Sequence, residues 1–128
     1  MDKKKILLVD DDHAFVEMVK MRLEFHGYET QVLEEAKEIL PSVHAFKPDA
    51  ILLDLLMPGT DGMDVCEMLN NDPMGVDIPI IVLSGLSKMA DKAKAYKLGV
   101  VDYLVKPIEP ADLITSVKKA IDAKSQED

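Results

Sequence analysis

Side chains of three chemical kinds directly follow the short apolar runs of this sequence. They are the carboxylates of Asp10, Asp11 and Asp54, the hydroxyl of Ser84 and the ammonium of Lys106. Carboxylates that share one crevice repel one another strongly, so they must take up protons, move apart or bind a cation. Mg2+ suits such a cluster because it prefers hard oxygen ligands and keeps several of its waters. The residue types therefore predict a Mg2+ site with a hydroxyl and an ammonium beside it.

The expected metal ligands suggest a reaction. Asp11 and Asp54 are the natural direct ligands, the backbone carbonyl of Leu56 is a third, and Asp10 is expected to act through a water. A carboxylate beside a metal ion and an ammonium can act as a nucleophile toward phosphorus. Phosphoryl transfer depends mainly on neutralising and orienting the non-bridging oxygens, here with Mg2+, Lys106 and Ser84. The expected product is an aspartyl phosphate on Asp54.

Short apolar runs alternate with longer amphipathic stretches along the whole chain. The expected strands are 6–9, 30–33, 50–53, 78–83 and 101–105. The expected helices are 13–26, 34–46, a third that ends near 70, 88–98 and a last one that starts at 109–110. Pro41 is expected to kink or shorten the second helix. This order predicts an α/β fold of five βα units, with a doubly wound parallel sheet between two helical layers.

The position of the polar residues in such a sheet favours a common site. Ligands of open parallel sheets bind beyond the carboxyl ends of the strands, where these side chains should meet. Each residue alone has a simpler interpretation: Asp12 is well placed to cap the first helix, Ser84 suits a loop and Lys106 a solvated surface. Independent loop residues have no reason to place an acid, a hydroxyl and an ammonium on successive strand ends.

Composition excludes several classes of function. The 128 residues suffice for one domain, expected at 1–123 with a polar tail at 124–128, and the net charge is −9. A broad basic surface for nucleic acid is therefore not expected, and no apolar run is long enough for a membrane span or a signal peptide. The single cysteine, Cys66, is expected to be a small buried core residue. We expect a cytoplasmic protein.

Four segments resemble the signature blocks of response-regulator receiver domains, such as those of chemotaxis regulators. They are ILLVDDD at 6–12, ILLDLLMPGTDG at 51–62, IIVLS at 80–84 and DYLVKP at 102–107. The resemblance covers about residues 4–123, and all blocks occur in order. It implies a flavodoxin-like fold and a place in a two-component or phosphorelay signalling system. Such a domain takes its phosphoryl group from a histidine kinase or a phosphotransfer protein and then acts on a downstream protein target.

The resemblance also implies roles for single residues. Asp54 matches the phosphoacceptor, Asp10 and Asp11 the acid pair, Ser84 the switch hydroxyl, Lys106 the conserved-type lysine and Tyr103 the aromatic switch residue. The Lys106–Pro107 bond matches one that is usually cis in the family. We expect a protein that catalyses only its own phosphorylation and dephosphorylation, and is not otherwise an enzyme. Val101 and Pro41 are mild departures from the pattern.

Two alternatives remain open at this point. A haloacid-dehalogenase-type phosphatase also has an apolar strand that ends in Asp-x-Asp, with Asp10 as nucleophile and Asp12 as general acid. That alternative leaves the turn after Asp54 unexplained and lacks an acidic pair after the lysine. The second alternative is a pseudo-receiver that serves only as an interaction module, which would ordinarily have lost one of the site residues.

Two further features lead to predictions. Four lysines lie on the expected fourth helix or directly before it, namely Lys88, Lys92, Lys94 and Lys97, and they make it a candidate partner surface on an acidic protein. Leu56 and Leu86 are expected to border the path of a water molecule toward the phosphoryl group. Neither can orient a water by hydrogen bonding, so a slowly hydrolysed phosphoryl group is expected.

Overall fold

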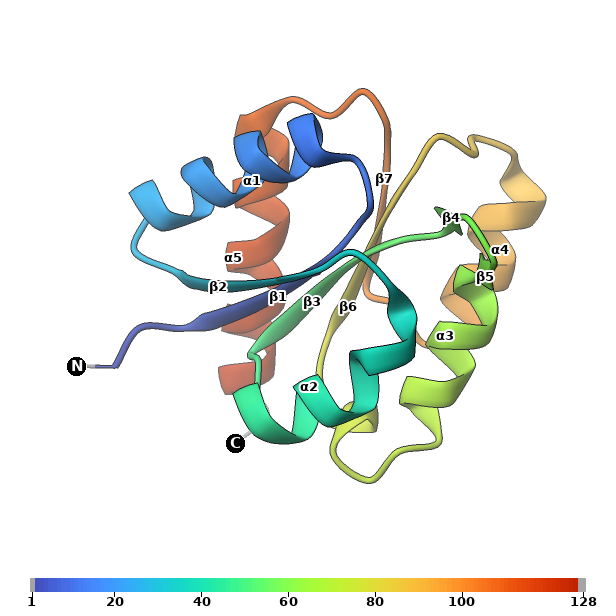
Figure 1. Ribbon diagram of the computed structural model, residues 1–128, viewed down its shortest axis with the longest axis horizontal. Helices are drawn as coiled ribbons and strands as arrows, with labels where there is room; N and C mark the ends of the chain where they lie inside the picture. Colours follow the sequence, from blue (N-terminus) through green and yellow to red (C-terminus); the bar gives the residue numbers. More distant parts are fainter. Residues whose placement is uncertain (1, 127–128) are drawn as a thin grey trace.

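The computed structural model describes residues 2–126 and contains one central parallel sheet. Its strands are β1 (Lys5–Val9), β2 (Glu29–Leu33), β3 (Ala50–Asp54), β6 (Ile80–Ser84) and β7 (Asp102–Val105). They lie in the order β2-β1-β3-β6-β7, and every neighbouring pair is parallel. The predicted doubly wound five-stranded fold is therefore confirmed (Figure 1).

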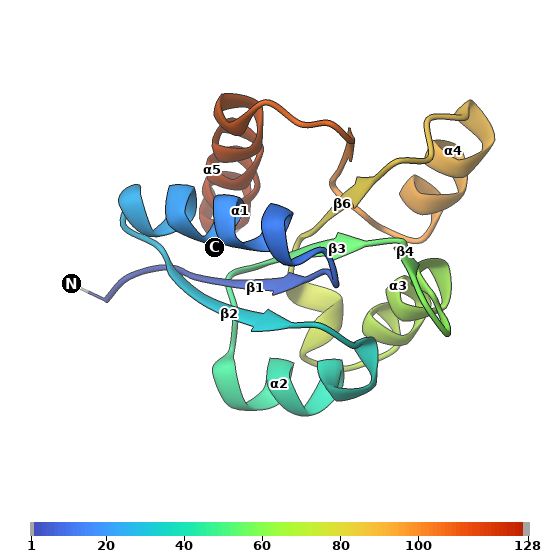
Figure 2. The same cartoon turned by 45° about the horizontal axis from the view of Figure 1, so that its top comes forward.

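Helices cover both faces of this sheet. They are α1 (His13–Phe25), α2 (Ile39–Phe46), α3 (Gly62–Asn70), α4 (Met89–Lys97) and α5 (Pro110–Gln126). Figures 1 and 2 show α1 and α5 together on one face, while α2 and α3 lie on the other. The chain crosses the sheet between these layers because β2 and β3 lie on either side of β1, which makes the sheet doubly wound.

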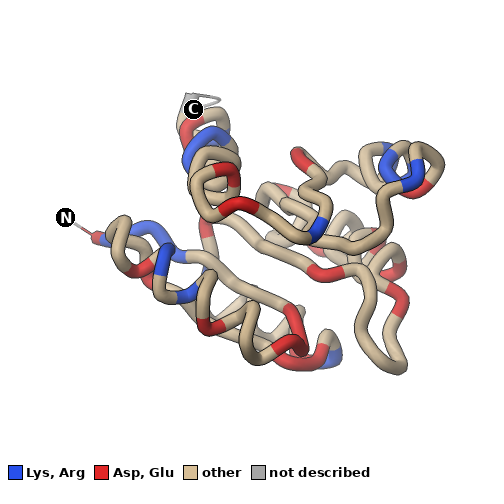
Figure 3. The backbone as a smooth tube through the Cα atoms, turned by 90° about the horizontal axis from the view of Figure 1, so that it is seen from above, with Lys and Arg blue, Asp and Glu red and all other residues tan. Residues whose placement is uncertain are grey.

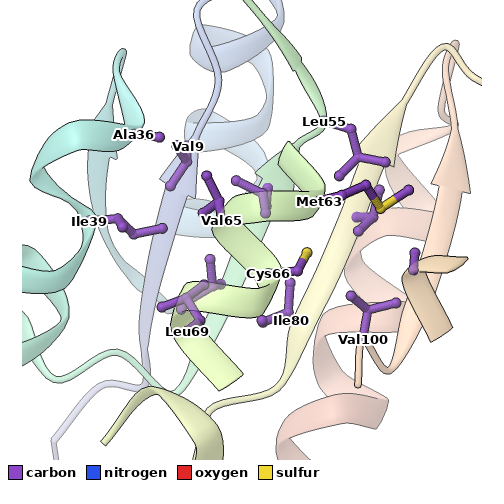
Figure 4. Packing of buried hydrophobic residues seen from close by; sticks show 14 of the residues in the cluster. Val9, Ala36, Ile39, Leu55, Met63, Val65, Cys66, Leu69, Ile80 and Val100 are labelled. Atoms are coloured by element: carbon purple, nitrogen blue, oxygen red, sulfur yellow. The ribbon is translucent and has the colours of Figure 1, made fainter. Parts of the chain in front are cut away.

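The strands are buried on both sides, which explains their continuous apolar sequences. Leu7, Leu8, Leu52 and Leu53 have no exposed surface. Alternate residues of each strand join two separate clusters, one under α1 and α5 and one under α2, α3 and α4. Figure 4 shows the second cluster, in which Cys66 points from α3 into the core as expected. Burial raises the pKa of the Cys66 thiol to about 11, so this thiol is a core residue rather than a nucleophile.

Local signals set the helix boundaries close to the predicted positions. Asp12 caps α1 by accepting a hydrogen bond from the amide of Phe15 at 3.2 Å. Asp61 caps α3 in the same way through the amide of Met63. Gly27 follows α1 with a φ of 91°, a left-handed conformation that glycine adopts without strain.

Three segments differ from the sequence-based expectation. The predicted helix 34–46 is divided into a short 3-10 helix, Ala36–Glu38, and α2. Pro41 therefore falls in the first turn of α2, where proline is tolerated because the amides of a first turn have no hydrogen-bond partner within the helix. Residues 56–61 form a small antiparallel hairpin, β4 (Leu56–Met57) and β5 (Thr60–Asp61), instead of a plain turn. The last helix continues beyond Ala123 to Gln126, so part of the expected polar tail is helical, and 127–128 lie outside the described residues.

Within residues 2–126, no helix is long and apolar enough to cross a membrane.

Candidate functional site at the carboxyl ends of the strands

The parallel register brings the predicted site residues to one edge of the sheet. Asp54 is the last residue of β3 and Ser84 the last residue of β6. Asp10 directly follows β1, whose last residue pairs with Leu53, and Lys106 directly follows the Val105 that pairs with Ser84. The four strand ends are neighbours, so these residues lie at one edge of the sheet as the sequence predicted.

Three carboxylates meet at this edge. One oxygen atom from each of Asp10, Asp11 and Asp54 lies within 4.8 Å of the others. Asp10 is fully buried and Asp54 is only 4% exposed, whereas Asp11 is the most accessible of the three. Several carboxylate oxygens that lie this close together match the preference of Mg2+ for hard oxygen ligands. The donor set therefore fits the ion that the sequence predicted.

The electrostatic surroundings of Asp54 make its ionised form costly. Its pKa is raised from 3.8 to about 6, mainly because burial disfavours the charged form. The amide of Leu56 donates to its Oδ1 at 3.0 Å and works in the opposite direction. The charge of Asp10 adds to the increase, and that of Lys106 offsets part of it. A positive ion at this point would relieve the repulsion.

Lys106 supplies the positive charge of the site. Its Nζ donates to Oδ2 of Asp10 at 2.9 Å and lies 3.7 Å from Oδ2 of Asp54. The lysine side chain is 23% exposed and the Asp10 side chain is fully buried, so the pair lies mostly away from water. The shorter contact goes to Asp10, which leaves the face of the ammonium toward Asp54 able to meet a further acceptor. The Lys106–Pro107 peptide bond is cis, as the resemblance implied.

An aromatic side chain completes the surroundings of this ammonium, and sequence reasoning did not foresee it. The Nζ of Lys106 lies 4.4 Å from the centre of the Phe15 ring. Phe15 lies in the first turn of α1, directly after the residues that supply the acids. The sequence indicated only that Phe15 lies near the acids, three residues after the cap residue Asp12. Nothing local in the sequence links α1 to the end of β7, so the contact with Lys106 could not be predicted.

The predicted switch residues converge on the loop after β6. Ser84 is fully buried, and its Oγ accepts a hydrogen bond from the amide of Leu86 at 3.0 Å. Tyr103 is 7% exposed, and its hydroxyl donates to the carbonyl of the same Leu86 at 2.8 Å. The predicted switch hydroxyl and the predicted aromatic switch residue are therefore joined through one backbone residue.

A backbone pairing and a close glycine contact define the loop after β3. Leu56 pairs with Asp61 in the hairpin, and its side chain is 54% exposed. Gly62 packs directly against the Leu55 backbone, and a Cβ at this position would lie 2.9 Å from the Leu55 carbonyl oxygen. Only glycine fits there, so this contact fixes the turn that follows Asp54. That the Leu56 carbonyl is a metal ligand stays a prediction.

Comparison with known proteins gives consistent matches. A sequence profile described as the response regulator receiver domain matches residues 6–118. The DNA-binding response regulator MtrA of Mycobacterium tuberculosis is 34% identical over 116 residues, which are 91% of this chain and 50% of that protein. The phosphate regulon transcriptional regulatory protein PhoB of Pseudomonas aeruginosa is 36% identical over 118 residues, or 92% of this chain and 52% of that protein. The chain spans about half the length of these curated relatives.

Solved structures agree over nearly the full length. A CheY-like response regulator receiver domain protein from Methanospirillum hungatei superposes with a TM-score of 0.92 at 28% identity, covering 99% of this chain and 100% of that one. The receiver domain of the Francisella response regulator 1452 gives a TM-score of 0.86 at 30% identity, covering 94% and 98%. Both are similar in size to the domain described here.

Proposed function

The chain belongs to the response regulator receiver domain family of two-component signalling, and from this membership we propose that Asp54 is its phosphoacceptor. The observation that carries the proposal is the position of Asp54, a buried carboxylate with a pKa raised to about 6 between two further acids and an ammonium. The haloacid-dehalogenase alternative is wrong, because the family match covers most of the chain. Asp12, the general acid of that alternative, caps α1 instead.

The proposed reaction moves one phosphoryl group. A histidine kinase or a phosphotransfer protein presents a phosphohistidine, and an Asp54 oxygen forms a bond to phosphorus as the bond to the histidine nitrogen breaks. Lys106 neutralises one non-bridging oxygen, and the Ser84 hydroxyl donates to another. Mg2+, held by Asp11, Asp54 and the Leu56 carbonyl with Asp10 acting through a water, would supply further neutralisation of the phosphoryl charge. The leaving imidazole keeps its electron pair and takes a proton from solvent.

Phosphorylation is proposed to act through the Leu86 connection. The Ser84 Oγ accepts the Leu86 amide, and a rotation of the Ser84 side chain toward a phosphoryl oxygen would break that hydrogen bond. The Leu86 carbonyl holds Tyr103, so a shift of this loop changes the surroundings of the aromatic ring. Couplings of this kind are worth about 1–3 kcal/mol. Such a value shifts the balance between two existing conformations without a change of fold.

We assign the partner surface to α4. Its lysines Lys92, Lys94 and Lys97 stand on a chain of net charge −9, and Figure 3 shows this helix as a basic segment. Met89 and Tyr96 on the same helix are 81% and 48% exposed, which adds apolar contact area. Lys92→Glu with Lys97→Glu should weaken binding to the downstream target while Asp54 is still phosphorylated. Unchanged binding would place the output surface elsewhere.

We also propose a cytoplasmic location, direct action on protein and not on nucleic acid, and autocatalysis limited to Asp54.

The decisive test is the mass of the intact protein after incubation with Mg2+ and acetyl phosphate. The wild type should gain one phosphoryl group, and Asp54→Asn should gain none. Asp12→Asn is the matched control, because asparagine still caps α1 and the acid removed is a near neighbour. A phosphoryl group on Asp54→Asn would overturn the assignment. A wild type that gains none would support the pseudo-receiver alternative.

A further inference from the structure

Three groups contact the ammonium of Lys106, and one of them carries no charge. Asp10 and Asp54 contribute carboxylates at 2.9 Å and 3.7 Å from Nζ, and the Phe15 ring centre lies at 4.4 Å. An ammonium at this distance from an aromatic ring is attracted by the negative potential above the ring face. The ring is therefore an electrostatic partner of Lys106 as well as an apolar neighbour.

The start of α1 places the ring at this point. The Asp12 carboxylate accepts the Phe15 amide at 3.2 Å, which fixes the first turn of the helix immediately beyond the acid pair. The rest of the half-buried Phe15 side chain packs against the core cluster beneath α1 and α5. Both backbone and side chain are thus held, so the ring is a rigid wall for a lysine that reaches the site from the end of β7.

We propose that Phe15 is a positioning residue for phosphoryl transfer, holding the Lys106 ammonium against Asp54 so that it meets the incoming phosphoryl oxygen. This inference rests on the proposed role of Asp54. Lysine has a long side chain that loses much rotamer freedom when it is fixed. The ring attracts the charge but takes up no strong hydrogen bond. It therefore leaves N–H donors of Lys106 free for phosphoryl oxygens, which a further carboxylate would not do.

A purely structural role makes a different prediction. An aliphatic side chain of similar size would fill the same space and keep α1 packed, but it would not attract the ammonium. The two roles separate when the charge distribution of the ring changes while its shape stays nearly constant. Stepwise fluorination of phenylalanine does this, because fluorine withdraws electron density from the ring face.

The experiment places mono-, di- and trifluorophenylalanine at position 15 and measures the rate of Asp54 phosphorylation by acetyl phosphate with Mg2+. We expect the rate to fall with each fluorine, by about two- to fivefold over the series, as suits a cation–π contact at a partly exposed site. Phe15→Tyr should keep most of the rate, and Phe15→Leu should lower it at least as much as the trifluorinated ring does. The same series at Phe25, which is 84% exposed at the far end of α1, is the matched control and should leave the rate unchanged.

A second measurement tests the contact without phosphorylation. In nuclear magnetic resonance spectra, the methylene protons beside the Lys106 ammonium should be shifted upfield by the Phe15 ring, and Phe15→Leu should remove the shift. A rate independent of fluorination, or Lys106 signals that do not respond to loss of the ring, would overturn the inference alone. A wild type that never gains a phosphoryl group on Asp54 would instead overturn the proposed function, and the positioning role with it.

Discussion

Two buried carboxylates at opposite ends of the strands have opposite surroundings. Asp54, at the carboxyl ends, is 4% exposed, and Asp72, between α3 and the start of β6, is 8% exposed. Asp72 accepts the amides of Met74 and Gly75 at 3.0 and 2.7 Å and the His44 ring nitrogen at 2.9 Å. Asp54 accepts a hydrogen bond from one backbone amide and lies close to the carboxylates of Asp10 and Asp11.

The difference shows that hydrogen-bond donors can offset the effect of burial, and so help to decide what a buried acid can do. The Gly75 amide and the other donors hold the pKa of Asp72 below its usual value, so this carboxylate stays ionised and links α2 to the loop before β6. Desolvation and neighbouring charge raise the pKa of Asp54 to about 6. An acid surrounded by donors stabilises the fold, whereas an acid short of donors is ready for a cation or a phosphoryl group.

Removing Asp72 should have the largest effect on stability. Asp72→Ala leaves two backbone amides and His44 without their acceptor, and unpaired buried donors are destabilising. We expect a fall of several degrees in the thermal midpoint and no change in the extent of Asp54 phosphorylation. Asp77→Ala, which removes an exposed acid nearby, is the control. Equal thermal midpoints for Asp72→Ala and Asp77→Ala would show that Asp72 does not stabilise the fold, and would contradict its contrast with Asp54.

Asp54→Asn should instead make the protein more stable at neutral pH, by roughly 1–2 kcal/mol once solvent screening is allowed for. The pKa of Asp54 rises from 3.8 to about 6 on folding, so the folded state binds its proton more tightly than the unfolded chain does. Stability contributed by the proton is therefore present at low pH and is lost as pH rises between those values. Denaturant unfolding at several pH values should show that the gain from Asn disappears below about pH 4.

The next effect in size is expected on Mg2+ binding, which should depend on the acids at the carboxyl ends of the strands and not on acids elsewhere. Asp11→Ala removes a proposed ligand and should raise the Kd for Mg2+ at least about tenfold. Asp64→Ala, which removes an exposed acid of α3, controls for the change in net charge. Isothermal titration calorimetry suits this protein because it has no tryptophan whose fluorescence could report the site. Wild-type affinity in Asp11→Ala would contradict the ligand role.

The features of the fold and the site that the sequence predicted are those with local signals, and the features that it missed depend on contacts between distant segments. Strands with continuous apolar sequence and helices with caps were predictable because their signals are local, and Asp54 was predictable because parallel strands end together. The link between His44 and Asp72 joins residues 28 apart, and the contact from Phe15 to Lys106 joins α1 to the end of β7. Such side-chain pairs depend on how the layers pack, so no single segment carries a signal for them.

The hairpin at 56–61 was missed for a different reason. Its strands have two residues each, too few for an alternating pattern, and the segment Met57-Pro58-Gly59 indicated only a turn. Pairing of Leu56 with Asp61 nevertheless fixes the backbone directly after Asp54. The consequence concerns the site, because the backbone position of the exposed Leu56, two residues after Asp54, is set by this pairing.

The smallest expected effect is on the lifetime of the phosphorylated state. Hydrolysis needs a water in line with the bond from Asp54 to phosphorus, and a side chain that orients this water accelerates the step. Leu56, with an exposed side chain, follows Asp54 by two residues, and Leu86 lies on the loop tied to Ser84 and Tyr103. Leucine has no hydrogen-bonding group that could orient a water. Leu56→Asn with Leu86→Glu should shorten the half-life of the purified phosphoprotein several-fold. Leu56→Met with Leu86→Met, which adds no hydrogen-bonding group, should leave it nearly unchanged. If both pairs shortened the half-life equally, motion of the loops would control water access, and the apolar character of the two leucines would not.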